Sequence, residues 1–163
     1  MNASERERTS GAGPRGQLLI AIRSAIAAAP NATSAMRQAV QLLKDALPHY
    51  TWVGIYLIDG EELVLGPFLG KPSPHTRIPL GRGICGAAAT EKATIVMDDV
   101  HADPRYLACS LETRSEIVVP IMDGPTVLGE IDIDSDQPAA FGAADRALLE
   151  QVAGLLAEAL SEA

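Results

Sequence analysis

Two pairs of strand-like segments, each joined by an Asp-Gly dipeptide, constrain the fold of this chain more than any other feature. Within each segment apolar and other residues alternate, and the dipeptides are Asp59-Gly60 and Asp123-Gly124. Alternating segments on both sides of a tight-turn dipeptide are typical of β-hairpins. The sequence therefore predicts two hairpins, whose strands are residues 51–58, 62–69, 116–122 and 127–134.

Helical patterns flank these hairpins. A first helix is predicted over 15–29, ending at Pro30, and a second begins with a cap at Thr33 or Ser34. A last helix is predicted over 143–160, with a buried leucine-rich stripe. The shorter elements expected are a strand at 77–80, a helix at 84–91, a strand at 94–97 and a long polar loop at 98–114. This order predicts an α+β fold, an antiparallel sheet with the N- and C-terminal helices on one face.

Length and charge narrow the class of protein. The chain has 163 residues, a length that favours a single domain. Residues 1–14 are polar and aperiodic, so we expect a flexible tail at 1–14 and the domain at 15–163. A net charge of −8 without a basic patch argues against nucleic acid as a partner. No apolar run is as long as a bilayer span, and no signal peptide is recognisable, so we expect no membrane partner and a cytoplasmic location.

The chain has two cysteines, Cys85 and Cys109. In a reducing compartment a disulfide between them would be transient and chemical rather than structural. Cys85 follows two glycines at a predicted helix start, which would lower its pKa and make it a candidate nucleophile. Cys109 lies in the long loop at 98–114, a common place for functional residues. Either cysteine could instead be a small apolar filler of the core.

Asp132 and Asp134 alternate with two isoleucines in a predicted strand, so both carboxylates share one face of the sheet. Glu116 begins the neighbouring strand and is expected to point into the same space. Crowded like charges raise at least one pKa, which would leave a protonated carboxyl able to donate a proton. The other carboxylates would bind the ammonium group of a free amino acid. For Asp134 a plain strand end is the alternative.

Trp52 and Tyr56 share one face of the first predicted strand, with Gly54 between them. Two aromatic walls with a gap at Gly54 suit an S-methyl group. Core packing is the alternative explanation. His49, His75 and His101 lack the spacing of metal ligands, so no metal is expected.

Several motifs together resemble one family. They are Trp52-Val53-Gly54-Ile55-Tyr56, Leu65-Gly66-Pro67-Phe68, Gly70-Lys71, Arg77-Ile78-Pro79, Gly81-Arg82-Gly83-Ile84-Cys85-Gly86, Asp99-Val100-His101, Ala108-Cys109, Ser115-Glu116-Ile117-Val118-Val119-Pro120 and Leu128-Gly129-Glu130-Ile131-Asp132-Ile133-Asp134-Ser135. In this order, over about residues 50–160, the chain resembles the free methionine-(R)-sulfoxide reductases, which are small single GAF-domain enzymes.

The resemblance implies a GAF-like sheet with a ligand pocket under loops on the face away from the helices. It implies reduction of free L-methionine-(R)-sulfoxide, with attack by Cys109 and resolution of its sulfenic acid by Cys85. The resulting disulfide would be recycled by a thioredoxin-like reductant and NADPH, with no bound cofactor. The resemblance also implies a homodimer paired through terminal helices. Trp52, Tyr56, Glu116, Asp132 and Asp134 would then bind the substrate.

Three features depart from the family pattern. Residues 72–76 lack a third cysteine, residues 110–114 differ, and Glu130 stands where an apolar residue is expected. Two other functions therefore stay open. One is a non-catalytic GAF module that binds a small molecule or senses redox state through a partner. The other is a dimerisation module, which would leave the aspartate pair without a purpose.

Overall fold

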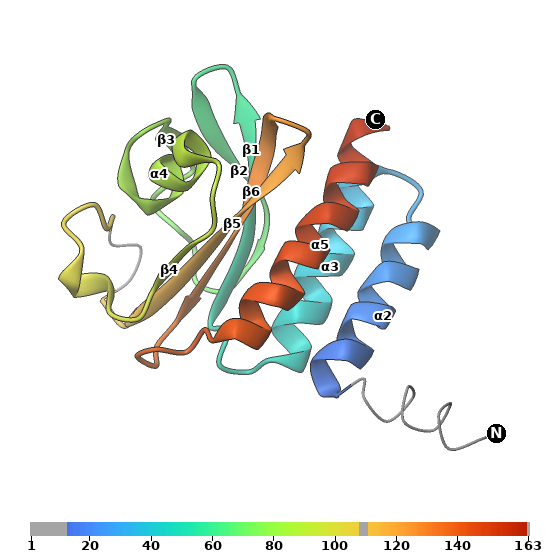
Figure 1. Ribbon diagram of the computed structural model, residues 1–163, viewed down its shortest axis with the longest axis horizontal. Helices are drawn as coiled ribbons and strands as arrows, with labels where there is room; N and C mark the ends of the chain where they lie inside the picture. The colour runs from blue at the N-terminus through green and yellow to red at the C-terminus, as the bar shows by residue number, and fades with distance from the viewer. Residues whose placement is uncertain (1–12, 108–110, 163) are drawn as a thin grey trace.

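The computed structural model describes residues 13–107 and 111–162, and these residues form one antiparallel sheet with helices on both sides (Figure 1). The strands are β1 (Trp52–Asp59), β2 (Glu62–Leu69), β3 (Arg77–Pro79), β4 (Ile95–Met97), β5 (Ser115–Asp123) and β6 (Thr126–Ser135). The helices are α2 (Pro14–Ala28), α3 (Ala32–Ala46), α4 (Gly83–Glu91), α5 (Ala143–Ser161) and the short 3-10 helix η1 (Val100–Ala102). The strand order is β3-β2-β1-β6-β5-β4, and every neighbouring pair is antiparallel.

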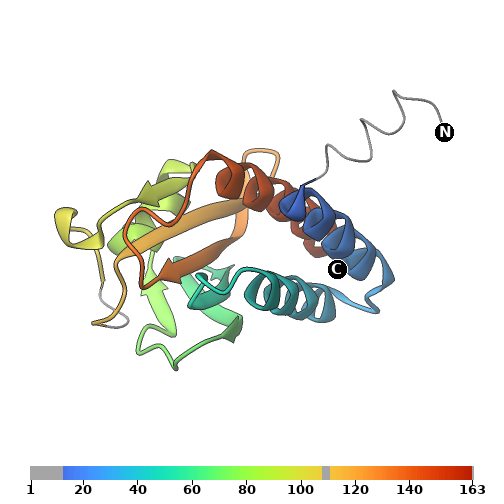
Figure 2. The same cartoon turned by 90° about the horizontal axis from the view of Figure 1, so that it is seen from below.

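The sheet separates two layers. Helices α2, α3 and α5 cover one face, while α4 and the segment that leads to η1 lie on the other, as the two perpendicular views agree (Figures 1 and 2). Both predicted hairpins are present, as β1–β2 and β5–β6. The central pair β1–β6 joins the two hairpins into one sheet. The predicted α+β architecture is confirmed.

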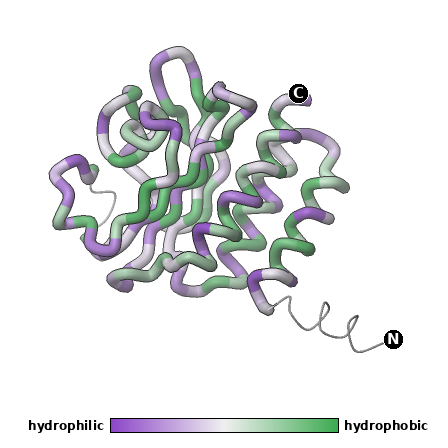
Figure 3. Tube along the Cα trace, in the orientation of Figure 1, coloured by the Kyte–Doolittle hydropathy of each residue, from purple (hydrophilic) through white to green (hydrophobic). Residues whose placement is uncertain are grey.

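The main hydrophobic core lies between the sheet and the three helices. Ile131 and Ile133 of β6 are fully or almost fully buried there, against Leu149, Val152 and Leu156 of α5. Hydropathy along the trace shows the hydrophobic residues gathered on the central strands and on the helices that cover them (Figure 3). Because side chains alternate along a strand, burying the isoleucines in this core turns Asp132 and Asp134 to the other face.

Two local predictions were wrong. The residue that caps α3 is Asn31, whose side chain accepts a hydrogen bond of 2.8 Å from the Ser34 backbone N–H. Thr33 and Ser34 are already helical, because Asn31 directly after Pro30 is the first residue free to take the extended conformation of a cap. The predicted tail also ends earlier than expected, because Pro14 is the first residue of α2. Residues 1–12 lie outside the described part of the chain.

A buried carboxylate ties the two terminal helices to the sheet. Asp145, in the first turn of α5, accepts a hydrogen bond of 2.6 Å from the Tyr50 hydroxyl and one of 2.9 Å from Arg15. Its second oxygen accepts from the Gly142 backbone N–H at 2.9 Å, which caps the helix. One side chain thus fixes α2, α5 and the start of β1 relative to one another.

Candidate active site

Three acidic side chains meet on the sheet face that α4 covers. Asp134 pairs with Glu116 of β5 on one side and with Trp52 of β1 on the other. Asp132, two residues earlier, pairs with Val118 and Gly54. Asp132 and Asp134 are each 2% exposed, and Glu116 is also buried. The predicted grouping of these acids follows directly from strand alternation and register.

Crowding and burial shape the electrostatics of this acidic cluster, which we define as Glu116, Asp132 and Asp134. One oxygen from each lies within 4.8 Å of the others, a spacing that would also suit a divalent cation. Burial, followed by the charge of Asp134, raises the pKa of Asp132 well above its ordinary value. Burial likewise raises the pKa of Asp134, against a hydrogen bond with Glu116 that lowers it. The cluster therefore retains protons that exposed carboxyls would release.

Cys85 reaches this cluster from the first turn of α4. Gly83 begins the helix at a φ of 69°, which favours glycine, and Gly86 lies so close to residues 79–81 that an added Cβ would sit 2.9 Å from the Gly81 nitrogen. This tight turn directs the Cys85 thiol at Asp132, to whose Oδ2 it donates a hydrogen bond of 3.4 Å.

The expectation that the helix start lowers the pKa of Cys85 was wrong. The residue is only 6% exposed, and burial, then the charges of Asp132, Glu130 and Glu116, raises its pKa well above the ordinary value. Loss of water and three nearby carboxyls outweigh a helix end, whose effect is about 1 kcal/mol or less. A thiol held neutral is a poor nucleophile, which favours Cys85 as the resolving rather than the attacking cysteine.

Trp52 and Tyr56 both face the site, and both reach across to the segment after β2. The Trp52 indole N–H donates to the Lys71 carbonyl at 3.0 Å, and the Tyr56 hydroxyl donates to the His75 carbonyl at 2.7 Å. The predicted gap at Gly54 is absent, because the Trp52 ring itself fills it and would collide with a Cβ there. The ring stacks on Phe68 at a centroid distance of 5.7 Å. Glycine at position 54 thus makes room for the indole rather than for a ligand.

Two small cavities adjoin the acidic cluster, one on each side. The outer cavity, of about 80 Å³, is lined by Trp52, Lys71, Glu112 and Asp134 among others. The inner cavity, of about 10 Å³, is lined by Tyr56, Cys85, Leu107, Glu116 and Asp132 among others. Between them they include every predicted substrate-binding residue and one of the two cysteines. Neither can hold an amino acid, so a ligand would have to join them by displacing the segments above.

Cys109, the predicted nucleophile, lies outside the described residues. Leu107, two residues before it, lines the inner cavity and packs against Gly83 at the start of α4.

Sequence reasoning missed two further residues at the site. Lys71 is one, and only its place in a motif pointed to it. Glu130 is the other, a buried acid two residues before Asp132 in the same alternation.

A larger hollow lies elsewhere. It is a groove of about 810 Å³ among α2, α3 and α5, on the far side of the sheet, lined by residues that include Arg23, Ile26 and Leu155. No acidic cluster or cysteine of the described chain lines it, so we place the chemistry at the smaller cavities.

Over residues 13–107 and 111–162, no helix has the length and apolar character needed to cross a bilayer.

Comparison with known proteins shows the family to which this chain belongs. The GAF domain family model matches residues 31–160. GAF domain-containing protein A of Dictyostelium discoideum is 39% identical over 140 residues, covering 85% of this chain and 83% of that protein. The free methionine-R-sulfoxide reductase of Escherichia coli is 38% identical over 120 residues, covering 74% of this chain and 72% of the enzyme.

Solved structures give the same result. The free methionine-R-sulfoxide reductase of Neisseria meningitidis, in complex with its substrate, superposes with a TM-score of 0.86 at 38% identity. The match covers 90% of this chain and 88% of that one. With relatives of this similarity over most of its length, the chain belongs to the GAF domain family and, within it, to the free methionine-R-sulfoxide reductases.

Proposed function

We propose that this protein reduces free methionine-(R)-sulfoxide to methionine. One observation carries the proposal above all. The Cys85 thiol donates to Asp132 inside a buried acidic cluster, and the adjoining cavities are lined by Trp52 and Tyr56. Thiol, retained protons and aromatic surface are the three things that sulfoxide reduction needs in one place. Free methionine-R-sulfoxide reductases of Escherichia coli and Neisseria meningitidis are similar to this chain, and their activity is the one that this chemistry would serve.

Substrate recognition rests on charge. The acidic cluster would bind the ammonium group of the amino acid, which a methionine inside a peptide does not have. Lys71 lines the outer cavity beside Asp134 and pairs with Glu112 at 2.7 Å, and both partners of this ion pair are exposed. Exposed ion pairs contribute little, so the substrate carboxylate can replace Glu112 as the partner of Lys71. The S-methyl group then lies against Trp52, in a sulfur-aromatic contact.

The first chemical step uses Cys109. Its thiolate attacks the sulfoxide sulfur, the oxygen takes a proton from a carboxyl of the acidic cluster, and the S–O bond breaks as oxygen passes to the cysteine. The products are methionine and the Cys109 sulfenic acid. Connectivity supports this role, because two residues of chain span roughly 7 Å at most and Leu107 lines the inner cavity.

The second step uses Cys85. Its sulfur attacks the sulfenic sulfur, hydroxide leaves and combines with the thiol proton as water, and a Cys85–Cys109 disulfide remains. An external dithiol such as thioredoxin, itself reduced by NADPH, then reopens the disulfide. No bound cofactor is needed for this cycle, which suits a reducing compartment such as the cytoplasm.

We also propose that the protein is a homodimer, paired through the terminal helices. The apolar Ile20 of α2 is 57% exposed, and the groove among α2, α3 and α5 is open to a second copy. Sedimentation of the wild-type protein and of Ile20→Lys tests this pairing. A monomer at micromolar concentration in the wild type would contradict it.

A non-catalytic ligand-binding module is the second candidate. The small size of the two cavities and the absence of a cysteine from residues 72–76 favour it. Calorimetry with free methionine sulfoxide separates the two functions. Heat that continues until substrate is exhausted, in the presence of a dithiol, indicates turnover. Heat that saturates at one equivalent indicates binding alone.

A single-turnover experiment tests the mechanism. Reduced wild-type protein, Cys109→Ser and Cys85→Ser are each mixed with excess free methionine sulfoxide without a reductant, and methionine is counted by chromatography. We expect one equivalent from the wild type, one from Cys85→Ser and none from Cys109→Ser. Mass spectrometry should find the Cys85–Cys109 disulfide only in the wild type. Methionine formed by folded Cys109→Ser would refute the assignment of the nucleophile.

A further inference from the structure

Glu130 is a buried acid to which the proposed cycle assigns no role. It precedes Asp132 by two residues on β6 and lies between Tyr56 of β1 and Pro120 of β5 in the register. The residue is 0% exposed, and neither carboxyl oxygen has a hydrogen-bond partner. Burying such a group is costly, and an apolar residue would fill the position at less cost. A side chain kept at this cost is a candidate for chemistry.

Cys85 lies close enough to Glu130 for each of the two side chains to shift the pKa of the other. Helix α4 packs on β5 and β6, and Cys85, Tyr56 and Val118 form one buried cluster on this face. Burial, then the charge of Asp132, raises the pKa of Glu130 well above its ordinary value, so its carboxyl keeps its proton to a higher pH than an exposed glutamate does. In return, Glu130 helps raise the pKa of the Cys85 thiol. The molecule therefore stores a proton beside the sulfur that Asp132 already contacts.

That stored proton matters when the disulfide is reopened. Cys85 is only 6% exposed, which shields its sulfur from an incoming dithiol, so in the proposed cycle the dithiol attacks the other sulfur of the disulfide and Cys85 is the leaving group. A thiol leaves faster when its pKa is low, whereas the surroundings of Cys85 raise its pKa. A thiolate released among buried carboxyls therefore needs a proton as it forms.

We propose that Glu130 is the residue that supplies this proton to Cys85 when the disulfide is reduced. The inference rests on the proposed Cys85–Cys109 disulfide. A thiolate of the dithiol attacks the Cys109 sulfur and forms a mixed disulfide with it. The bond to Cys85 breaks, its electron pair stays on the Cys85 sulfur, and that sulfur takes the Glu130 proton. The carboxylate regains a proton from the second thiol of the dithiol as the mixed disulfide closes.

Other groups around Cys85 are less suited to this role. The titratable side chains that face this region are Glu116 of β5, Asp132 and Asp134 of β6, and Tyr56 of β1. Tyr56 already donates to the His75 carbonyl. Asp132 accepts the thiol hydrogen of reduced Cys85 and belongs to the acidic cluster, whose protons the proposed cycle already uses on the sulfoxide oxygen. Glu130 is fully buried, has a raised pKa and interacts with the Cys85 side chain itself, so its proton is available to that sulfur.

The test measures disulfide reopening directly. Wild-type protein and Glu130→Gln are oxidised by one turnover with free methionine sulfoxide, then mixed with dithiothreitol between pH 6 and 9. Thiol alkylation and mass spectrometry follow the loss of the disulfide. Glutamine keeps the shape of the side chain but has no acidic proton. We expect reopening to be about a hundredfold slower in Glu130→Gln at pH 8, the lower end of what a general acid contributes. The deficit should shrink toward pH 6, where the solvent supplies protons.

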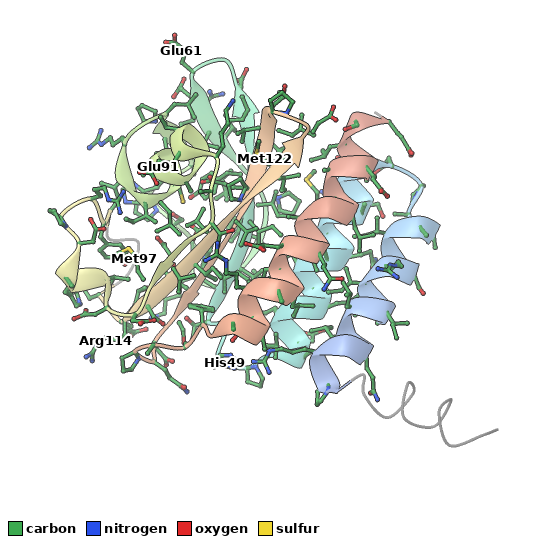
Figure 4. All side chains as sticks on the ribbon, viewed as in Figure 1. His49, Glu61, Glu91, Met97, Arg114 and Met122 are labelled. Atoms are coloured by element: carbon green, nitrogen blue, oxygen red, sulfur yellow. The ribbon has the colours of Figure 1, made fainter. Side chains whose placement is uncertain are left out.

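The matched control is Glu61→Gln, which makes the same substitution at an exposed side chain, at the tip of the β1–β2 hairpin (Figure 4). It should reopen at the wild-type rate. Thermal unfolding of Glu130→Gln should occur at or above the wild-type temperature, so slow reopening cannot be blamed on a damaged fold. Glu130→Asp should restore part of the rate.

The outcomes separate the inference from the function on which it rests. No methionine from the wild type refutes the proposed activity, and methionine without a Cys85–Cys109 disulfide refutes the proposed cycle; either result overturns the inference too. If the disulfide forms and Glu130→Gln reopens it at the wild-type rate at every pH, only the role of Glu130 is refuted.

Discussion

Asp132 and Asp134 show how single residues give this fold its chemistry. Two carboxyls inside one buried strand stretch oppose folding, because water can no longer stabilise their charges. Oδ1 of each is buried and has no hydrogen-bond partner among the described residues. A bound ammonium group could donate hydrogen bonds to both oxygens. Ligand binding would then offset the cost of burying these carboxyls.

Replacing Asp134 separates binding from folding. Asp134→Asn removes one charge from the ammonium site, and a hydrogen bond to a charged group contributes about 1.5–3 kcal/mol. We expect KM for free methionine sulfoxide to rise by roughly 10- to 150-fold, while the free energy of unfolding stays level or increases. Steady-state kinetics and urea unfolding measure the two effects.

Asp123→Asn, in the exposed β5–β6 turn, is the control for this change and should alter neither quantity. An unchanged KM in Asp134→Asn would mean that the carboxylate does not contact the substrate.

At the scale of elements, the sequence predicted the helices and strands but not the surroundings of individual side chains. Both hairpins and the α-helices α2 to α5 were predicted because their signals are local: alternation around Asp-Gly, a stripe of leucines, a proline that ends a helix. The grouping of Glu116, Asp132 and Asp134 was also predictable, since it follows from strand alternation.

The surroundings of Cys85 were not predictable in this way. Its thiol contacts Asp132, 47 residues away in the sequence. Position at a helix start suggested a lowered pKa, whereas burial and carboxyls brought by β5 and β6 raise it. Similarly, only the packed structure shows that the Trp52 ring fills the space above Gly54. Contacts between distant segments decide such properties, and no local pattern encodes them.

The contacts of Asp145 with Tyr50 and Arg15, which we call the helix–sheet joint, yield a prediction about stability. Asp145→Asn removes the charge that accepts from Tyr50 and Arg15 and weakens the cap of α5. We expect a loss of about 1–3 kcal/mol in the free energy of unfolding with little change in KM, since the site is on the other face. Tyr50→Phe and the double variant complete a cycle that isolates the Tyr50–Asp145 contact.

The pH response of this joint follows from the hydrogen bonds. The bond from Tyr50 leads the contacts that hold the pKa of Asp145 below 3.8, against the effect of burial. Its contribution is therefore present above pH 4 and is lost as the pH falls through the folded-state pKa. Identical losses for Asp145→Asn at pH 2.5 and pH 7 would contradict this linkage.

For the whole molecule, the buried acids predict an opposite trend at higher pH. Burial raises the pKa values of Glu130, Asp132 and Asp134, so the folded state binds more protons than the unfolded state above about pH 4. Stability must then fall as the pH rises from that point toward the raised folded-state values. Urea unfolding between pH 5 and 8 measures this slope, which should be shallower in Glu130→Gln. Parallel curves for the two proteins would show that Glu130 does not titrate on unfolding.

The most direct measurement for the account as a whole is a stereospecific assay on the folded wild-type protein. Free methionine sulfoxide, as a mixture of its R and S forms, is supplied with thioredoxin, its reductase and NADPH, and the two forms are resolved by chiral chromatography. The account predicts that the R form disappears with matching NADPH oxidation, while the S form and N-acetylated methionine sulfoxide remain. Consumption of the N-acetylated compound at the same rate, or no consumption of the free R form, would contradict it.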